Sequence, residues 1–149
     1  FGSADLGTDL AGWDWFSIQL ADNRELMVYR LRHADGSSDA ASSGTLVFPD
    51  GHTQHLSASE IQLTPLDTWT SSTSKATYPS HWQVSIPSLG LALKLNPLLA
   101  DQELRTSHST RVTYWEGAVT VEGTEQGQAI KGQGYVELTG YAERIKQKL

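Results

Sequence analysis

The stretch Gly12-Trp13-Asp14-Trp15-Phe16-Ser17-Ile18-Gln19-Leu20 decides the fold class, because its large side chains alternate between two faces. Residues Phe16, Ile18 and Leu20 fall on one face, and the two tryptophans fall on the other. Successive side chains of a β-strand point to opposite sides of the sheet, so this alternation is typical of a strand with one face in a core. The sequence therefore predicts a half-buried β-strand over residues 13–20.

The same pattern recurs along most of the chain. Residues 24–32 form a second alternating run, and Ala21-Asp22-Asn23 has the length of a hairpin loop. Short strands with turn signals roughly every 8–12 residues are typical of a β-barrel or a β-sandwich. We therefore predict an all-β chain folded as an antiparallel β-barrel, with a β-sandwich as the alternative. The expected strands cover residues 13–20, 24–32, 45–48, 53–57, 60–65, 81–86, 89–95, 112–122 and 129–139.

Four segments do not follow the alternating pattern. Residues 33–43 are small and polar and read as a mobile loop, and residues 67–80 are rich in Ser and Thr and read as a long loop across a barrel mouth. A short turn of helix is expected near Leu98–Glu103. Residues 142–149 are expected to be a short C-terminal helix or a frayed tail.

Length and composition narrow the class of protein. A chain of 149 residues is long enough for one domain with its own core. The net charge of −6 argues against binding to nucleic acid or to anionic membranes, which both favour clustered Lys and Arg. No apolar run approaches the roughly 20 residues of a membrane-spanning helix. Because the chain begins at Phe1 without an initiator Met, we interpret it as part of a longer or processed protein.

Motifs for cofactors and metals are not evident. The sequence has no Gly-rich phosphate loop and no His-Glu-x-x-His motif, and it has no cysteine to bind zinc. His52 and His55 are three positions apart, but no further ligands can be placed beside them. We therefore expect no cofactor and no metal site.

Asp14 is one candidate catalytic residue. Its position in the alternation puts it on the face of Phe16 and Ile18. A carboxyl buried against apolar groups favours its protonated form and can serve as a general acid. The alternative is structural: Asp14 caps a turn after Gly12 or pairs with Arg30 across the predicted hairpin.

Glu116 is the second candidate catalytic residue. It shares a strand face with Tyr114, and Glu137 shares one with Tyr135. Adjacent strands would bring the two acids close together, and paired carboxylates can divide into an acid and a base. The alternative is that both acids lie on the solvent face of the sheet.

Large aromatic residues beside these acids are candidate walls of a pocket for an apolar ligand. Arg30 is either a surface residue or an inward partner for an acid. Core packing is the alternative for the tryptophans. The candidate ligand-binding residues are Trp13, Trp15, Tyr29, Arg30, Trp82, Tyr114, Trp115 and Tyr135.

Several motifs, in order along the chain, resemble the AttH-like and carotenoid 1,2-hydratase (hydroxyneurosporene synthase) family. They are Gly12–Leu20, Glu25–Arg32, Tyr78-Pro79-Ser80-His81-Trp82, Asp101-Gln102-Glu103-Leu104, Tyr114-Trp115-Glu116-Gly117 and Gly134–Tyr141. The resemblance implies a lipocalin-like β-barrel that is the C-terminal half of a two-domain protein and packs on an N-terminal lipocalin-like domain. It also implies export to the bacterial periplasm or cell envelope.

The resemblance further implies a function. Characterised relatives add water to a carbon–carbon double bond of an apolar polyene without a cofactor, and many members are described as secreted hydrolases. We expect this chain to bind a hydrophobic small molecule and to hydrate or hydrolyse it. The resemblance does not indicate the proton donor; the strand pattern alone makes Asp14 the candidate, with Trp13, Trp15, Tyr29 and Trp115 as walls. The alternatives are a non-catalytic carrier of lipids or polyenes, and a structural half that only packs on its partner domain.

Overall fold

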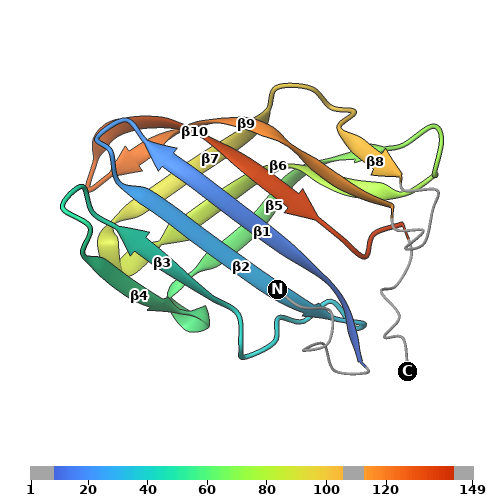
Figure 1. The fold of residues 1–149 in the computed structure, drawn as a ribbon, viewed down its shortest axis with the longest axis horizontal. Coiled ribbons are helices and arrows are strands. Elements are labelled where there is room, and N and C mark those ends of the chain that lie inside the picture. Colours follow the sequence, from blue (N-terminus) through green and yellow to red (C-terminus); the bar gives the residue numbers. More distant parts are fainter. Residues whose placement is uncertain (1–8, 106–112, 143–149) are drawn as a thin grey trace.

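A computed structural model describes residues 9–105 and 113–142 and places them in one antiparallel sheet of ten strands. The sheet is strongly curled (Figure 1) and its strand order is β4-β3-β2-β1-β10-β9-β7-β6-β5, with β8 paired to β9. The strands are β1 (Leu10–Leu20), β2 (Glu25–His33), β3 (Ser43–Val47), β4 (Thr53–Ser57), β5 (Gln62–Thr70), β6 (Thr77–Ile86), β7 (Leu91–Pro97), β8 (Glu103–Arg105), β9 (Thr113–Glu125) and β10 (Gln128–Leu138). Two short 3-10 turns, η2 (Ala58–Glu60) and η3 (Pro87–Leu89), link β4 to β5 and β6 to β7.

The predicted all-β antiparallel fold is confirmed. Strands β4 and β5 are the two ends of the strand order, and no ladder joins them within the described residues. The sheet is therefore a curled half-barrel with a seam between its first and last strands.

Tight turns set the register of the two hairpins that carry the candidate site residues. Strand β1 returns into β2 with Asn23 at φ 70°, and the Leu20 N–H donates to the Arg24 carbonyl oxygen at 2.8 Å. Strand β9 returns into β10 through Gln126 at φ 48° and Gly127 at φ 82°. Two consecutive residues with positive φ are the requirement of a two-residue type I′ hairpin turn.

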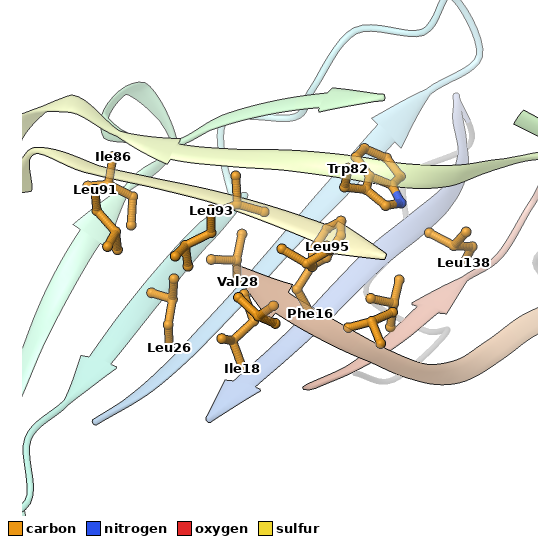
Figure 2. Close-up of a cluster of buried hydrophobic side chains, with 14 of the residues drawn as sticks. Phe16, Ile18, Leu26, Val28, Trp82, Ile86, Leu91, Leu93, Leu95 and Leu138 are labelled. Atoms are coloured by element: carbon orange, nitrogen blue, oxygen red, sulfur yellow. The ribbon is translucent and has the colours of Figure 1, made fainter. Parts of the chain in front are cut away.

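The core lies on the concave side of the curled sheet. Figure 2 shows Phe16 of β1 and Val28 of β2 on one wall, facing Trp82 of β6 and Leu93 of β7 on the other. The rings of Phe16 and Trp82 meet edge to face with centroids 5.0 Å apart. Burying each such side chain stabilises the fold by about 1.5–3 kcal/mol, so this core holds the two walls together.

The loop predicted over residues 67–80 is wrong for most of its length. Strand β5 continues to Thr70 and β6 begins at Thr77, so only the turn between them is irregular. Threonine is β-branched and favours extended backbone, and Trp69 stacks on Tyr78 at 6.2 Å between centroids. The Ser and Thr residues here are divided between two paired strands, as at Thr68, Thr70 and Thr77, and the turn over residues 71–74 that joins them.

The helix predicted near Leu98–Glu103 is also wrong. The chain from Leu98 to Gln102 is irregular, with bends at Leu98 and Ala100, and strand β8 begins at Glu103. Gln102 fixes this segment to β9, because its carbonyl oxygen accepts the Glu116 N–H at 3.1 Å and its side chain accepts the Ala118 N–H at 3.0 Å. The expected C-terminal helix falls almost wholly on residues 143–149, which lie outside the described residues.

Neither of the two helical segments in the described part of the chain is long enough to cross a membrane.

Candidate functional site

The structure divides the candidate site residues between the two faces of the sheet. Alternation along β1 is strict from Gly12 onward, and it sends Asp14 to the core face and Trp13 and Trp15 to the outer face. Four of the candidates are on the core face: Asp14, Arg30, Trp82 and Trp115. The other six are on the outer face: Trp13, Trp15, Tyr29, Tyr114, Glu116 and Tyr135. One pocket containing all of these residues, as the sequence analysis expected, is therefore not formed.

On the outer face, four residues form a continuous line across four strands. Trp15 of β1 has Tyr29 of β2 opposite it on one side and Glu137 of β10 on the other. Glu137 in turn has Glu116 of β9 opposite it. We call this set the acidic–aromatic row. Directly opposed residues of an antiparallel pair have Cβ atoms about 4.5–5.5 Å apart, so the expected proximity of the two acids is confirmed.

Glu137 has the perturbed titration expected of one member of a carboxylate pair. Burial raises the pKa of Glu137, and the negative charge of Glu116 raises it further. A hydrogen bond from the side chain of Trp13 opposes these effects without cancelling them. The protonated form of Glu137 is therefore favoured beyond the usual pH range of a glutamic acid.

Glu116 is surrounded by phenols. Burial raises the pKa of both Tyr114 and Tyr135, and the charge of Glu116 and hydrogen bonds to it raise each further. Both phenols therefore stay neutral at physiological pH and donate to the Glu116 carboxylate. The outer face thus holds a carboxyl with a raised pKa, a second carboxyl opposite it, and aromatic side chains on both sides, and this arrangement suits general acid–base chemistry on an apolar molecule.

Asp14 lies at the centre of a second cluster, on the core face. It is fully buried, and its Oδ2 accepts hydrogen bonds from Arg30 Nε at 3.0 Å and Nη2 at 2.8 Å. Its Oδ1 accepts from Arg32 Nη1 at 2.8 Å and from the Tyr141 hydroxyl at 2.7 Å. Arg32 also donates to the Thr139 carbonyl oxygen at 2.6 Å, and it lies 3.9 Å above the Tyr141 ring centroid.

This cluster confirms the pairing of Asp14 with Arg30 across the hairpin. The general-acid hypothesis required a carboxyl surrounded by apolar groups, whereas Asp14 is ion-paired with two guanidinium groups. Gly12 allows β1 to approach the end of β10 here, because a Cβ at this position would collide with the Thr139 carbonyl oxygen. The Asp14 cluster therefore fastens β1, β2 and the chain after β10 to one another.

Trp82 and Trp115 belong to the core. Trp82 is 1% exposed and lies 5.5 Å from the Arg30 guanidinium carbon, and its indole nitrogen has no partner within the described residues. Trp115 is 3% exposed and its indole N–H donates to the Ala100 carbonyl oxygen at 2.8 Å. Core packing, which was the alternative to a role in a ligand pocket, therefore holds for both tryptophans.

Sequence reasoning missed two members of the Asp14 cluster. Arg32 could have been found, because it lies two positions from Arg30 and therefore on the same strand face. Tyr141 is 127 positions from Asp14, and no local pattern links them. In the part of the chain that the structure describes, no group of three or more His, Asp or Glu side chains could hold a metal ion.

Comparison with known proteins identifies relatives over nearly the whole chain. Residues 1–141 match the family described as AttH-like. Kievitone hydratase from Fusarium solani subsp. phaseoli is 24% identical over 133 residues, which is 85% of this chain and 35% of that protein. The chain therefore spans about a third of the length of this curated relative.

Two solved structures share the fold. A crystal structure from Nitrosomonas europaea, described as an AttH, is 38% identical with a TM-score of 0.79, over 91% of this chain and 40% of that one. Kievitone hydratase from Nectria haematococca is 24% identical with a TM-score of 0.71, over 90% of this chain and 40% of that one. The half-barrel, the family match and the relative from Nitrosomonas europaea agree, and this chain belongs to the AttH-like family.

Proposed function

We propose that this chain is part of an enzyme that adds water to a carbon–carbon double bond of a hydrophobic small molecule, without a cofactor, at the outer face of β1, β2, β9 and β10. The similarity to kievitone hydratase supports the reaction class. The observation that carries the proposal is the opposition of Glu116 and Glu137, with the pKa of Glu137 raised by burial and by the charge of Glu116. Hydration needs an acid and a base near neutral pH, and such a pair supplies both.

The proposed chemistry assigns one step to each acid. The Glu137 carboxyl gives its proton to one alkene carbon, and the π electrons form the new C–H bond. The other carbon becomes cationic, and the π faces of neighbouring aromatic rings such as Trp15 stabilise it. Water adds to this carbon while Glu116 accepts a proton from it. Transfer of that proton from Glu116 back to Glu137 restores the starting state.

The apolar substrate would lie on the row rather than inside the half-barrel. The core fills most of the concave side, with Phe16, Leu26, Val84 and Leu93 fully buried. Trp13, Trp15 and Tyr29 are partly exposed on the outer face and offer an aromatic surface beside the acids. In the intact protein, an N-terminal lipocalin-like domain would cover this face and exclude water, in agreement with the 35–40% of its relatives' length that this chain spans.

The test is to incubate the intact protein with kievitone and with other apolar alkenes in ¹⁸O-labelled water. The proposal predicts a product carrying one labelled oxygen and one added water. Binding of the alkenes without any labelled product would support a carrier instead and would contradict the proposal.

A further inference from the structure

We infer that the core side of β2 carries a second, separate site, which binds a small organic monocarboxylate through Arg30. The site is a cavity of about 160 Å³ at the seam of the half-barrel. Tyr29 of the acidic–aromatic row also lines this cavity, but Arg30 is on the core face of β2, so the proposed binding does not use the Glu116–Glu137 pair. Nothing in the chemistry proposed above uses this cavity.

One side of this cavity is polar. It is formed by Arg30 of β2 and by Ser38, Ser42 and Ser43 on the chain that leads into β3. Ser42 is buried, and its Oγ accepts the Leu31 N–H at 3.0 Å, which leaves its hydroxyl hydrogen available to a ligand. Among the described residues that line the cavity, none is acidic.

The charge at this side is positive. Asp14 is a single carboxylate held between two guanidinium groups, so the buried cluster carries a net charge of about +1. Arg30 uses Nε and Nη2 on Asp14, and its Nη1 has no acceptor among the described residues. A cation that is not fully neutralised, in a partly buried setting, is stabilised by an anion of single charge.

The other side of the cavity is apolar. The apolar lining residues are Val28 and Tyr29 of β2, Ala58 of η2, Ile61 just before β5, and Leu63 of β5. A ligand with a charged oxygen group at one end and a short hydrocarbon at the other would match both sides. Pockets for drug-sized molecules measure roughly 300–1,000 Å³, so this cavity takes a molecule of only a few carbons, or one end of a longer one.

A single carboxylate fits better than a phosphate. A phosphate dianion favours several donors and more than one available cation, whereas this wall offers one partly used guanidinium and a few hydroxyls. Arginine presents its N–H groups in a planar fork that suits a carboxylate. The apolar side adds affinity only for a ligand that carries a hydrocarbon tail.

The test is calorimetric titration of the intact protein with hexanoate, and with hexanol and inorganic phosphate as comparisons. We expect saturable binding of hexanoate with one molecule per chain, and binding of hexanol at least about tenfold weaker, because a charge-assisted hydrogen bond contributes about 1.5–3 kcal/mol. Arg30→Gln should weaken hexanoate at least about tenfold, whereas Lys94→Gln, which removes an exposed charge on β7, should not.

A second variant separates binding from folding. Arg30→Gln removes a partner of Asp14 and can destabilise the chain, whereas Ala58→Phe leaves the ion pairs intact and fills the apolar side of the cavity. Hexanoate binding should be lost in Ala58→Phe while the circular dichroism spectrum is unchanged. Absence of saturable hexanoate binding, equal binding of hexanol or of phosphate, or unchanged binding in Ala58→Phe would each overturn the inference.

Discussion

Glu116 and Glu137 are opposite each other across the β9–β10 ladder, and the pKa of Glu137 is raised by burial and by the charge of Glu116. Like charges directly opposed in a sheet are destabilising, so a structural role alone does not account for this pair. The proposed hydratase function offers a role for the pair, because an acid–base pair requires two carboxyls that differ in pKa.

The coupling of the two acids predicts a titration result. Replacing Glu116 by Gln removes the negative charge opposite Glu137, so the pKa of Glu137 should fall toward its ordinary value, although burial will keep it from returning fully. Carbon-13 NMR titration of the Glu137 carboxyl measures this directly. Glu122→Gln changes an exposed acid on the same strand and should leave the Glu137 titration unchanged; an equal shift in both variants would show that the pair is not specifically coupled.

The raised pKa of Glu137 also predicts how stability depends on pH. The folded state favours protonated Glu137, so this residue stabilises the fold at a pH below its unfolded pKa, and the contribution is lost as the pH rises through the folded pKa. Glu137→Gln cannot ionise and should lose less stability than the wild type between about pH 4 and pH 7. Urea unfolding across this pH range measures the free energy of unfolding of both proteins. If this free energy changes with pH equally in the wild type and in Glu137→Gln, the pKa of Glu137 is not raised.

Glu103 should show the opposite pH dependence. Burial raises the pKa of Glu103, but hydrogen bonds from Ser74, Ser71 and Tyr78 together outweigh burial, and the pKa is lowered. The Ser74 bond is 2.6 Å long and joins the β5–β6 turn to β8. The stabilisation is present above the unfolded pKa of Glu103 and is lost as the pH falls through its folded pKa.

Ser74→Ala removes one of these bonds, so it should cost about 0.5–1.5 kcal/mol or more near pH 7 and progressively less as Glu103 protonates in acid. Ser59→Ala, at an exposed position in η2, is the control. If the cost of Ser74→Ala does not change with pH, the Ser74 hydroxyl does not stabilise the fold through the charge of Glu103, and the prediction is wrong.

The Asp14 cluster makes a stability prediction. Asp14→Asn keeps the side-chain shape but leaves Arg30 and Arg32 without their carboxylate, and breaking a buried ion pair from one side costs about 3–5 kcal/mol. Glu25→Gln removes an exposed carboxylate from β2 and should change the free energy of unfolding by no more than about 0.5 kcal/mol. Denaturant unfolding compares the two, and an Asp14→Asn cost as small as that of Glu25→Gln would contradict the structural role assigned to Asp14.

Much of this fold could be predicted from alternation alone. The face of Asp14, Phe16 and Ile18 follows from the period of two in β1, and so does the opposite face of Trp13 and Trp15. Composition misled at residues 67–80, because Ser and Thr are common both in loops and on the exposed side of strands. The extended conformation of these residues depends on the pairing of β5 with β6, which composition does not indicate.

The site was harder to predict, because it depends on register. The proximity of Glu116 and Glu137 requires the β9–β10 turn to fall at Gln126–Gly127, and a slip of one residue would send Glu137 to the other face. The Asp14 cluster depends on Tyr141, which reaches Asp14 because β10 pairs with β1 and puts Leu138, three residues before Tyr141, opposite Asp14. Local sequence patterns carry no information on such a contact.

The most direct test of Glu137 as the general acid compares alkene hydration by the intact wild-type protein with that of Glu137→Gln, using Glu122→Gln as the matched control. Loss of a general acid costs roughly 100- to 10,000-fold in kcat, so we expect a loss of this size in Glu137→Gln with substrate binding retained, and nearly full activity in Glu122→Gln. Hydration at the wild-type rate by Glu137→Gln would contradict the assignment of the outer-face acid pair as the catalytic site.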